Sequence, residues 1–331
     1  MDLKRIAEAE ECLRSASKHV KTTLLKWKPD YDSAAAEYDR AAVCFKNANA
    51  NERCMNTYEQ AAECHEKCGN KFHAAKSKEQ AALMARDLGL MEKAKVLMEE
   101  ASQLYAETGT AETSAQALGK AAKFFETVDY PKAVEMYEKA YQLIEDTEKS
   151  RKASEFLHRM TKLHMKHEIY LAASETLERE IELCADNRDV ARAGHLASQL
   201  LVLWLEGLDD SVAANKAFQR CFRVKGFDNS EEARVLKALI DAIDDRDGER
   251  LHSLLDRAQF KGMDGEFIRL ARNLKKRFHK TEKGKVAAMN GDTASKTEAG
   301  ANAQGCNSGG DRAFDKINIE DNEEEEGLGL C

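Results

Sequence analysis

The amino-acid sequence predicts an all-α protein: a tetratricopeptide-like twisted array of antiparallel helical hairpins, closed by a C-terminal helical bundle and followed by a disordered acidic tail. The first observation behind this prediction is composition. Ala, Glu, Lys and Leu dominate the 331 residues, and only two prolines occur. Such side chains lose little rotamer freedom in a helix. The apolar fraction of 43% suffices for a core, while 33% charged residues indicate the large solvated surface of a repeat array.

The second observation is an internal repeat of 20 residues. Larger side chains stand three residues before or after most of its small pairs, on the same face of a helix. Small residues let neighbouring helices approach closely, and the larger ones fill the space beside them. A helix of about 14–16 residues with a short turn fits this period, so that two units form a hairpin of about 40 residues. The small pairs are Ala41-Ala42, Ala61-Ala62, Ala81-Ala82, Ala101-Ser102 and Ala121-Ala122, and the larger residues include Tyr38, Phe45, Tyr58, His65, Tyr105, Phe125 and Tyr137.

Turn signals fall between the small pairs. They are Cys68-Gly69-Asn70, Leu88-Gly89, Thr108-Gly109-Thr110 and Val128-Asp129-Tyr130-Pro131. Glycine is typical just after a helix, and proline is typical of the first turn of the next one. The repeat continues at Ala140-Tyr141 and loosens from about residue 190.

We therefore expect three parts: a helical-repeat array over residues 1–190, a helical bundle over 191–285, and a disordered linker with an acidic tail over 286–331. A basic segment, Arg269–Lys285, closes the bundle, and an acidic run, Glu320–Glu326, precedes the last five residues.

Charge and cysteine content exclude several classes of protein. Residues 287–331 carry a net charge of −7 out of −8, which leaves the remaining chain nearly neutral and argues against nucleic acid as a partner. The nine cysteines are odd in number and form no CxxC pair, as expected of free thiols in a reducing compartment. The sequence shows no signal peptide and no apolar run of the roughly 20 residues that span a bilayer. We expect a cytoplasmic protein with, at most, peripheral membrane contact.

The sequence offers no catalytic motif. It has no phosphate-binding GxxxxGK[ST] loop and no GxSxG elbow. His158, His164, His167 and Glu168 lack the spacing of a zinc-binding HExxH helix, and His65 of Cys64–Cys68 occupies a packing position of the repeat. We expect no enzyme activity, metal, cofactor or small-molecule substrate. Helical arrays bind proteins on a concave surface, so the residues alone indicate a scaffold or adaptor.

One segment is more specific. Leu24-Leu25-Lys26-Trp27-Lys28-Pro29-Asp30-Tyr31-Asp32-Ser33-Ala34-Ala35, continuing through Tyr38 and Ala41–Ala48, closely resembles the gamma-type members of the soluble NSF attachment protein (SNAP) family. The resemblance extends more loosely over residues 1–275 and returns in the acidic tail ending Leu-Cys. It implies an adaptor for vesicle-mediated transport, including ER–Golgi transport and membrane fusion. Several copies would surround a syntaxin-type SNARE complex and recruit the hexameric N-ethylmaleimide-sensitive factor (NSF) ATPase.

The resemblance assigns roles to two groups of residues in the folded region. The loop with Leu24, Leu25, Lys26, Trp27 and Lys28 would contact the membrane, since Trp with Lys neighbours suits a bilayer interface. SNARE complexes present acidic surfaces, so a gripping face needs cations. Arg159 falls where alpha-type relatives carry a functional Lys, whereas their other key Lys falls at Gln116. The candidates for this face are Lys120, Lys152, Arg159 and Lys162.

The third group lies in the tail. The acidic residues would meet a basic surface of the ATPase, and Leu330 matches the near-terminal Leu by which relatives stimulate ATP hydrolysis. The residues are Glu323, Glu324, Glu325, Glu326, Leu328 and Leu330.

Alternatives remain open at this stage. Trp27 could instead pack its loop onto the next helix, the repeat cations could be merely solvated, and the tail could serve solubility. A general tetratricopeptide-like scaffold, for instance a co-chaperone that clamps peptide C-termini, is the alternative function. It predicts a peptide-sized groove lined by Lys and Asn, and no role for residues 320–331.

Overall fold

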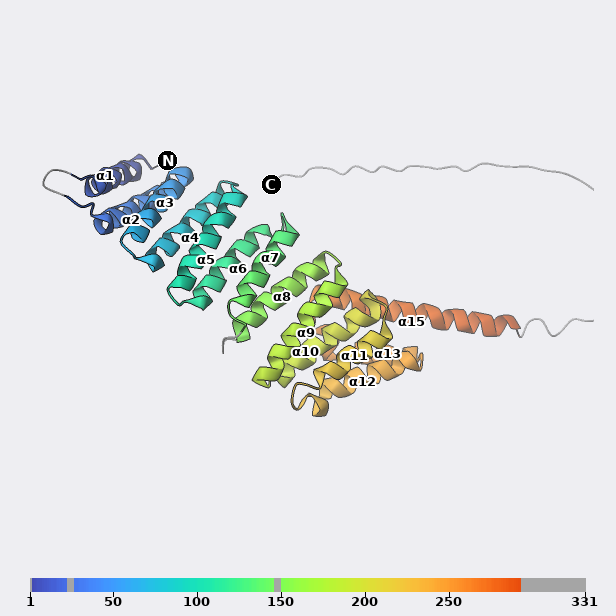
Figure 1. Cartoon of the computed structure of the whole chain (residues 1–331). Coiled ribbons are helices and arrows are strands. Elements are labelled where there is room, and N and C mark those ends of the chain that lie inside the picture. Colours follow the sequence, from blue (N-terminus) through green and yellow to red (C-terminus); the bar gives the residue numbers. More distant parts are fainter. Residues whose placement is uncertain (1, 23–26, 146–149, 293–331) are drawn as a thin grey trace, which may run out of the picture. The chain divides into compact units, whose positions relative to one another are not determined.

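The computed structural model describes residues 2–22, 27–145 and 150–292 (Figure 1). Within these ranges the chain forms helices and turns and contains no strand, which confirms the predicted all-α class. The chain up to Glu282 forms one compact unit, to which the following description refers. The predicted disordered tail lies outside the described residues.

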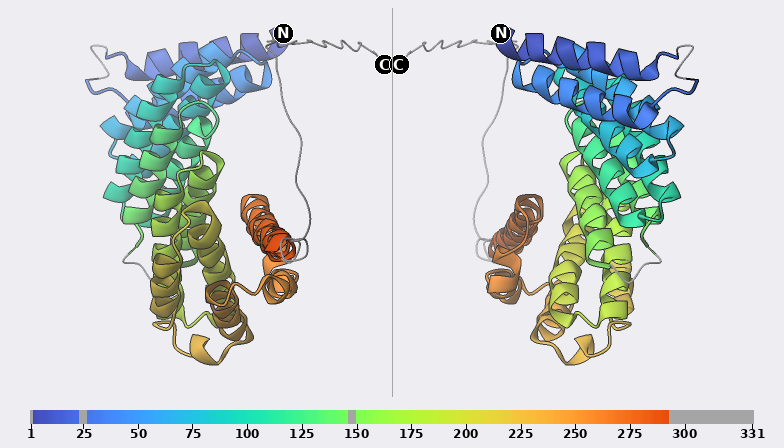
Figure 2. Two further views of the ribbon diagram at one scale, coloured as in Figure 1. Left: turned by 90° about the vertical axis from the view of Figure 1, so that its right-hand side faces the viewer. Right: turned by 90° about the vertical axis from the view of Figure 1, so that its left-hand side faces the viewer.

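From the first helix to α13, each helix packs against the next one along the chain, and the helices of the array are antiparallel neighbours (Figure 1). The helix axes rotate progressively from the first helices to α9, as the two views in Figure 2 show. The first nine helices are α1 (Leu3–Val20), α2 (Tyr31–Asn47), α3 (Asn51–Lys67), α4 (Lys71–Asp87), α5 (Met91–Glu107), α6 (Ala111–Phe125), α7 (Tyr130–Gln142), α8 (Ser150–Lys166) and α9 (Tyr170–Asn187). The others are α10 (Val190–Val202), continued by a π-helical turn (Leu203–Gly207), α11 (Ser211–Cys221), a 3₁₀ turn (Phe227–Asn229), α12 (Glu231–Asp244), α13 (Gly248–Leu255), α14 (Ala258–Lys261) and α15 (Gly265–Asp292).

The 20-residue period divides into a helix of 17 residues and a turn of three in α2–α5, so these helices are slightly longer than the sequence predicts. The middle residue of each turn adopts a left-handed conformation, with φ of 79°, 76° and 76° at Gly69, Gly89 and Gly109. The residue that follows it donates its amide to a carbonyl five residues earlier, as when Leu90 N bonds to Ala85 O at 2.9 Å. This Schellman arrangement satisfies the carbonyls at a helix end.

The small pairs form the contacts between neighbouring helices. All ten residues of the five pairs are buried, and nine of them are alanines with no more than 1% exposure. Most of the predicted larger residues are buried beside them, and Phe45, Tyr105, Phe125 and Tyr137 are almost completely covered. Tyr38 is only partly buried, against a small cluster of Ala34, Ala35 and Cys64. The repeat therefore has the packing role that the sequence predicts for it.

Two large hydrophobic clusters hold most of the buried apolar residues. The first runs from Ala9 to Leu163, and the second from Met165 to Leu274. The second cluster takes in the helices from α9 onward and uses larger aliphatic side chains, such as Leu196, Leu200 and Leu236. This change in residue type is the physical reason why the small-pair repeat fades in the second half. The domain boundary expected near residue 190 stays a prediction.

Helix α15 carries the predicted basic segment. Arg269 pairs with Glu168 in the turn after α8 at 3.0 Å, and Arg277 donates to Asp209 at 2.5 Å and to the carbonyl oxygen of Leu205 at 2.6 Å. Cations of α15 therefore join it to the turns that follow α8 and α10.

The turn geometry gives a first prediction. Replacing Gly89 with Ala should lower the free energy of unfolding by about 1 kcal/mol, because an L-residue is strained at positive φ. No atom lies within 4 Å of an added Cβ, so packing adds no cost. Asn at this position should cost less than Ala. Asn49, in the turn between α2 and α3, already adopts the same left-handed conformation. Denaturant unfolding measures both changes.

Gly265→Ala is the control, because Gly265 has open space around it and no positive φ. Equal stability losses for Gly89→Ala and Gly265→Ala would contradict the assignment of the cost to the left-handed turn.

Candidate functional site

Three of the four predicted cations of the repeat helices line one pocket of about 250 Å³. Lys120 comes from α6, and Lys152 and Arg159 come from α8. On α8, positions 152, 155, 156 and 159 share one face, since residues three, four and seven apart are neighbours on a helix. The other lining residues are Gln116, Gly119, Lys123, Tyr137, Glu155 and Phe156.

The residues at the pocket differ from the predicted set of cations: one predicted cation lies elsewhere, and one further cation is present. Lys162 is exposed on α8 but does not line the pocket. Gln116, the position where alpha-type relatives were expected to carry Lys, does line it. Lys123 was missed, although it stands one helical turn after Lys120. Lys120, Lys123, Lys152 and Arg159 are called the basic face below.

At the pocket, the ring of Phe156 on α8 lies directly against the backbone of α6 at Gly119. A Cβ at this position would lie 2.6 Å from Cε1 of Phe156, well inside van der Waals contact. Phe156 is largely buried and stands between Lys152 and Arg159 in the sequence of α8. The absent side chain of Gly119 thus leaves room for the ring of Phe156 against α6.

Carboxylates from preceding helices hold three cations of the basic face. Lys120 pairs with Glu79 of α4, and Lys152 pairs with Glu112 of α6. Arg159 lies 3.8 Å from Glu126, the residue that follows α6.

Two of these carboxylates are themselves anchored by tyrosines from the core. The hydroxyl of Tyr105 donates to Glu79 at 3.0 Å, and that of Tyr137 donates to Glu126 at 2.5 Å. Burial, together with the neighbouring glutamate, raises the pKa of each tyrosine above its ordinary value. Both hydroxyls therefore stay protonated at neutral pH and act as donors.

The predicted membrane loop is only partly within the described residues. Leu24, Leu25 and Lys26 lie outside them. Trp27 is 86% exposed, and Lys28 is exposed beside it. An indole with this exposure is not buried against α2, the packing alternative raised by the sequence. The predicted tail residues, Glu323, Glu324, Glu325, Glu326, Leu328 and Leu330, also lie outside the described part of the chain.

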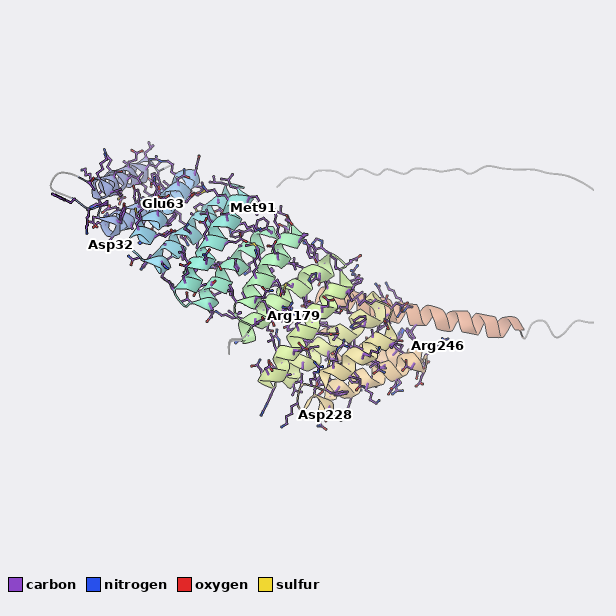
Figure 3. All side chains as sticks on the ribbon, in the orientation of Figure 1. Asp32, Glu63, Met91, Arg179, Asp228 and Arg246 are labelled. Carbon is purple, nitrogen blue, oxygen red and sulfur yellow. The ribbon has the colours of Figure 1, made fainter. Side chains whose placement is uncertain are left out.

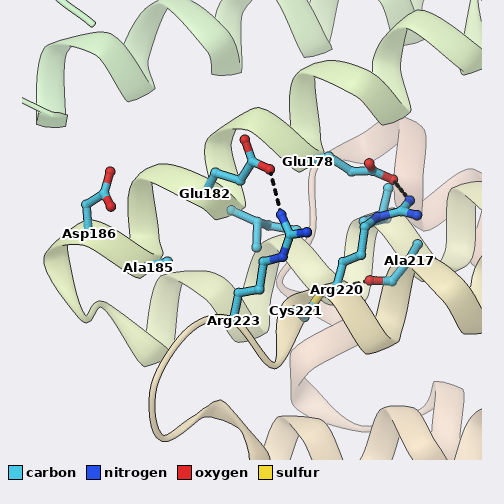
Figure 4. A pocket seen from close by; sticks show the side chains of 10 residues that line it. Glu178, Glu182, Ala185, Asp186, Ala217, Arg220, Cys221 and Arg223 are labelled. Carbon is cyan, nitrogen blue, oxygen red and sulfur yellow. Dashed lines mark hydrogen bonds and ion pairs between the residues drawn. The ribbon is translucent and has the colours of Figure 1, made fainter. Parts of the chain in front are cut away.

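A second pocket, of about 210 Å³, lies between α9 and α11 (Figure 4). Ile181, Leu200 and Ala217 give it an apolar lining, and two ion pairs join its helices: Arg223 to Glu182 at 3.3 Å, and Arg220 to Glu178. Burial raises the pKa of Cys221, another lining residue, to about 12. The thiol is thus protonated at neutral pH and is no nucleophile.

Comparison with known proteins identifies the family. The family model described as "Soluble NSF attachment protein, SNAP" matches residues 5–264. The chain belongs to the soluble NSF attachment protein family.

Two relatives of this SNAP-family chain are gamma-soluble NSF attachment proteins. The one from Arabidopsis thaliana is 27% identical over 174 residues, which cover 52% of this chain and 58% of that protein. The one from Dictyostelium discoideum is 26% identical over 174 residues, 52% of each chain. The matched segment thus spans little more than half the length of these relatives. The resemblance to gamma-type members of the family, inferred from Leu24–Ala35, is confirmed.

Solved structures similar to this SNAP-family chain include BtubC from P. vanneervenii, with a TM-score of 0.38 and 16% identity over 69% of this chain and 92% of that one. They also include PilF of Pseudomonas aeruginosa, with a TM-score of 0.32 and 15% identity over 70% and 96%. In the described residues, no helix is long and apolar enough to cross a membrane, and no group of three or more His, Cys, Asp or Glu is arranged to hold a metal ion.

The close approach at Gly119 gives the second prediction. Gly119→Val should lower the free energy of unfolding by about 1–3 kcal/mol, because the side chain displaces Phe156 from a filled interface. Thermal and denaturant unfolding measure the loss. Gly265→Val is the matched control, since no atom lies within 4 Å of a Cβ there. A Gly119→Val protein as stable as this control would contradict the role given to Gly119.

Proposed function

We propose that this SNAP-family protein is a non-enzymatic adaptor that binds assembled SNARE complexes through the basic face and recruits and stimulates the NSF ATPase through its acidic tail. The gathering of four cations from α6 and α8 at one pocket is the observation that carries this proposal. SNARE complexes are the acidic, helical partners that the family resemblance implies. Cations on a rigid helical surface steer such a partner and fix its orientation.

The membrane contact belongs to the same proposal. Trp27 exposes an amphipathic ring between Lys21 and Lys28, both also exposed. Tryptophan favours the interfacial layer of a bilayer, and each lysine near an anionic surface contributes about 1 kcal/mol. Peripheral contact of this kind raises the effective concentration of the adaptor beside a membrane-anchored SNARE complex in the cytoplasm.

The tail supplies the second partner. Glu323–Glu326 would meet a basic surface of the ATPase, and Leu328 and Leu330 would enter an apolar site on it. Burying one leucine contributes about 1.5–3 kcal/mol, enough for a tenfold or larger effect. In this scheme residues 1–190 bind the SNARE complex, residues 191–285 support the array, and residues 286–331 couple it to the ATPase.

The basic face gives a third prediction. The double change Lys120→Gln and Lys152→Gln should weaken binding to a purified four-helix SNARE complex by about five- to tenfold at low salt, because two cations facing the partner are removed. Equilibrium binding by fluorescence anisotropy measures the loss. The double change Lys132→Gln and Lys139→Gln is the matched control, since these lysines also pair with glutamates but lie on α7, outside the basic face.

Binding that is unchanged by the first pair of substitutions would remove the basic face from the proposal. If the unsubstituted protein also fails to bind any SNARE complex, the scaffold or co-chaperone function becomes the better explanation.

The tail gives a fourth prediction. A chain ending at Gly329 should still bind the SNARE complex but should lose most ATP-dependent disassembly by NSF, because Leu330 is missing at the coupling step. Disassembly is followed by loss of energy transfer between two labelled SNARE helices, with the full-length chain as the control. Full disassembly activity of the shortened chain would exclude Leu330 from coupling.

A further inference from the structure

We propose that Glu79, Glu112 and Glu126 set the affinity of the basic face, because an acidic partner must compete with these internal carboxylates for the cations. This inference rests on the proposed function and concerns residues to which the sequence gave no role.

Ion pairs recur between a helix and the second helix after it, mostly about 40 residues further along the chain. In each of these pairs the carboxylate stands on the earlier helix and the cation on the later one. Arg179, labelled in Figure 3, pairs in this way with Glu138 at 2.8 Å. On odd-numbered helices the other pairs are Glu10–Arg53, Glu59–Lys93, Glu92–Lys132, Glu99–Lys139 and Glu178–Arg220. Glu182 of α9 pairs in the same order with Arg223, just after α11.

The even-numbered helices follow the same rule at the basic face. Their pairs are Glu79–Lys120 and Glu112–Lys152, and Glu126 after α6 pairs with Arg159 of α8. Three of the cations predicted to grip a partner, Lys120, Lys152 and Arg159, are therefore cations that the array also uses internally.

The geometry places the carboxylates beneath the cations. The side chains of Glu79, Glu112 and Glu126 are 11%, 27% and 26% exposed, whereas those of their cations are 49%, 38% and 38% exposed. An approaching partner thus meets the cations first, with a negative charge behind each of them.

The carboxylates cannot easily move away. Tyr105 holds Glu79 and Tyr137 holds Glu126 from within the core, and Gln116 donates to Glu112 at 3.5 Å from the next turn of α6. The lysines have long, flexible side chains, so the cation rather than the carboxylate reorients towards a partner. A carboxylate of the partner must therefore compete with the internal glutamate for the same cation.

Competition of this kind tunes affinity without abolishing it. Partly exposed ion pairs of this type are worth little individually, because water and salt screen them. Removing one internal carboxylate should therefore raise affinity for an acidic partner modestly, and the gain should shrink as ionic strength rises.

The test uses the full-length chain with Glu112→Gln, which keeps the side-chain shape and removes the charge. Binding to the purified four-helix SNARE complex should become about two- to fivefold tighter at low salt, and the gain should fade as salt increases. The matched control is Glu92→Gln. Like Glu112, Glu92 lies in the first helical turn and pairs with a lysine 40 residues later, but it lies on α5. The control should leave SNARE affinity unchanged.

A double-mutant cycle with Lys152→Gln separates this inference from the proposed function. The gain from Glu112→Gln should vanish when Lys152 is also replaced, because the freed charge is then absent. If Lys152→Gln weakens binding while Glu112→Gln leaves it unchanged or weakens it, the competition is wrong and the basic face stands. If neither change affects binding, the basic face itself is wrong.

Discussion

The close approach of neighbouring helices at pairs of small residues is the contact on which the rest of the array depends. Alanines at 41, 61, 81, 101 and 121 are completely buried, so the backbones of successive helices meet with little side-chain volume between them. A repeat of 17 helical residues and three turn residues returns each helix with the same face inward. The left-handed turn residue makes so short a connection possible, and glycine supplies it at least cost. Helix length, turn chemistry and core composition thus all follow from the same requirement, which is close packing of successive helices.

The network of ion pairs follows from that constraint. When every second helix is equivalent, a carboxylate and a cation about 40 residues apart come within reach of each other, and the same pairing recurs along the array. Each pair contributes little stability by itself. Together the repeated pairs fix how the helices are aligned with one another, because contacts between alanines alone specify this alignment poorly. In these pairs the carboxylate stands on the earlier helix, so the cations that take part in them already have a partner within the array.

The sequence was sufficient to predict the fold because its repeat expresses contacts between adjacent helices, which depend on local spacing. It also predicted Lys120, Lys152 and Arg159, which the structure brings to one pocket, although their binding role stays a prediction. It could not reveal the glutamates beneath them, since each comes from an earlier helix and is oriented by a buried tyrosine or a neighbouring glutamine. The pairing of Tyr105 with Glu79 leaves no local pattern in the chain. In the second hydrophobic cluster, larger side chains replace the small pairs, so the sequence shows no repeat there.

The paired state of the basic face bears on how an attachment protein can work. Unpaired cations facing an acidic helical bundle would bind it tightly and release it slowly, whereas cations shared with fixed internal carboxylates bind it with many weak, screened contacts. In the proposed function, such a grip would depend on several contacts acting together, including the proposed membrane contact through the exposed Trp27, and it would be lost when the geometry of the partner changes. An adaptor that holds a complex for dismantling needs this kind of affinity, because the bundle must leave its surface once it has been unwound. The glutamates therefore belong to the proposed binding surface as much as the cations do.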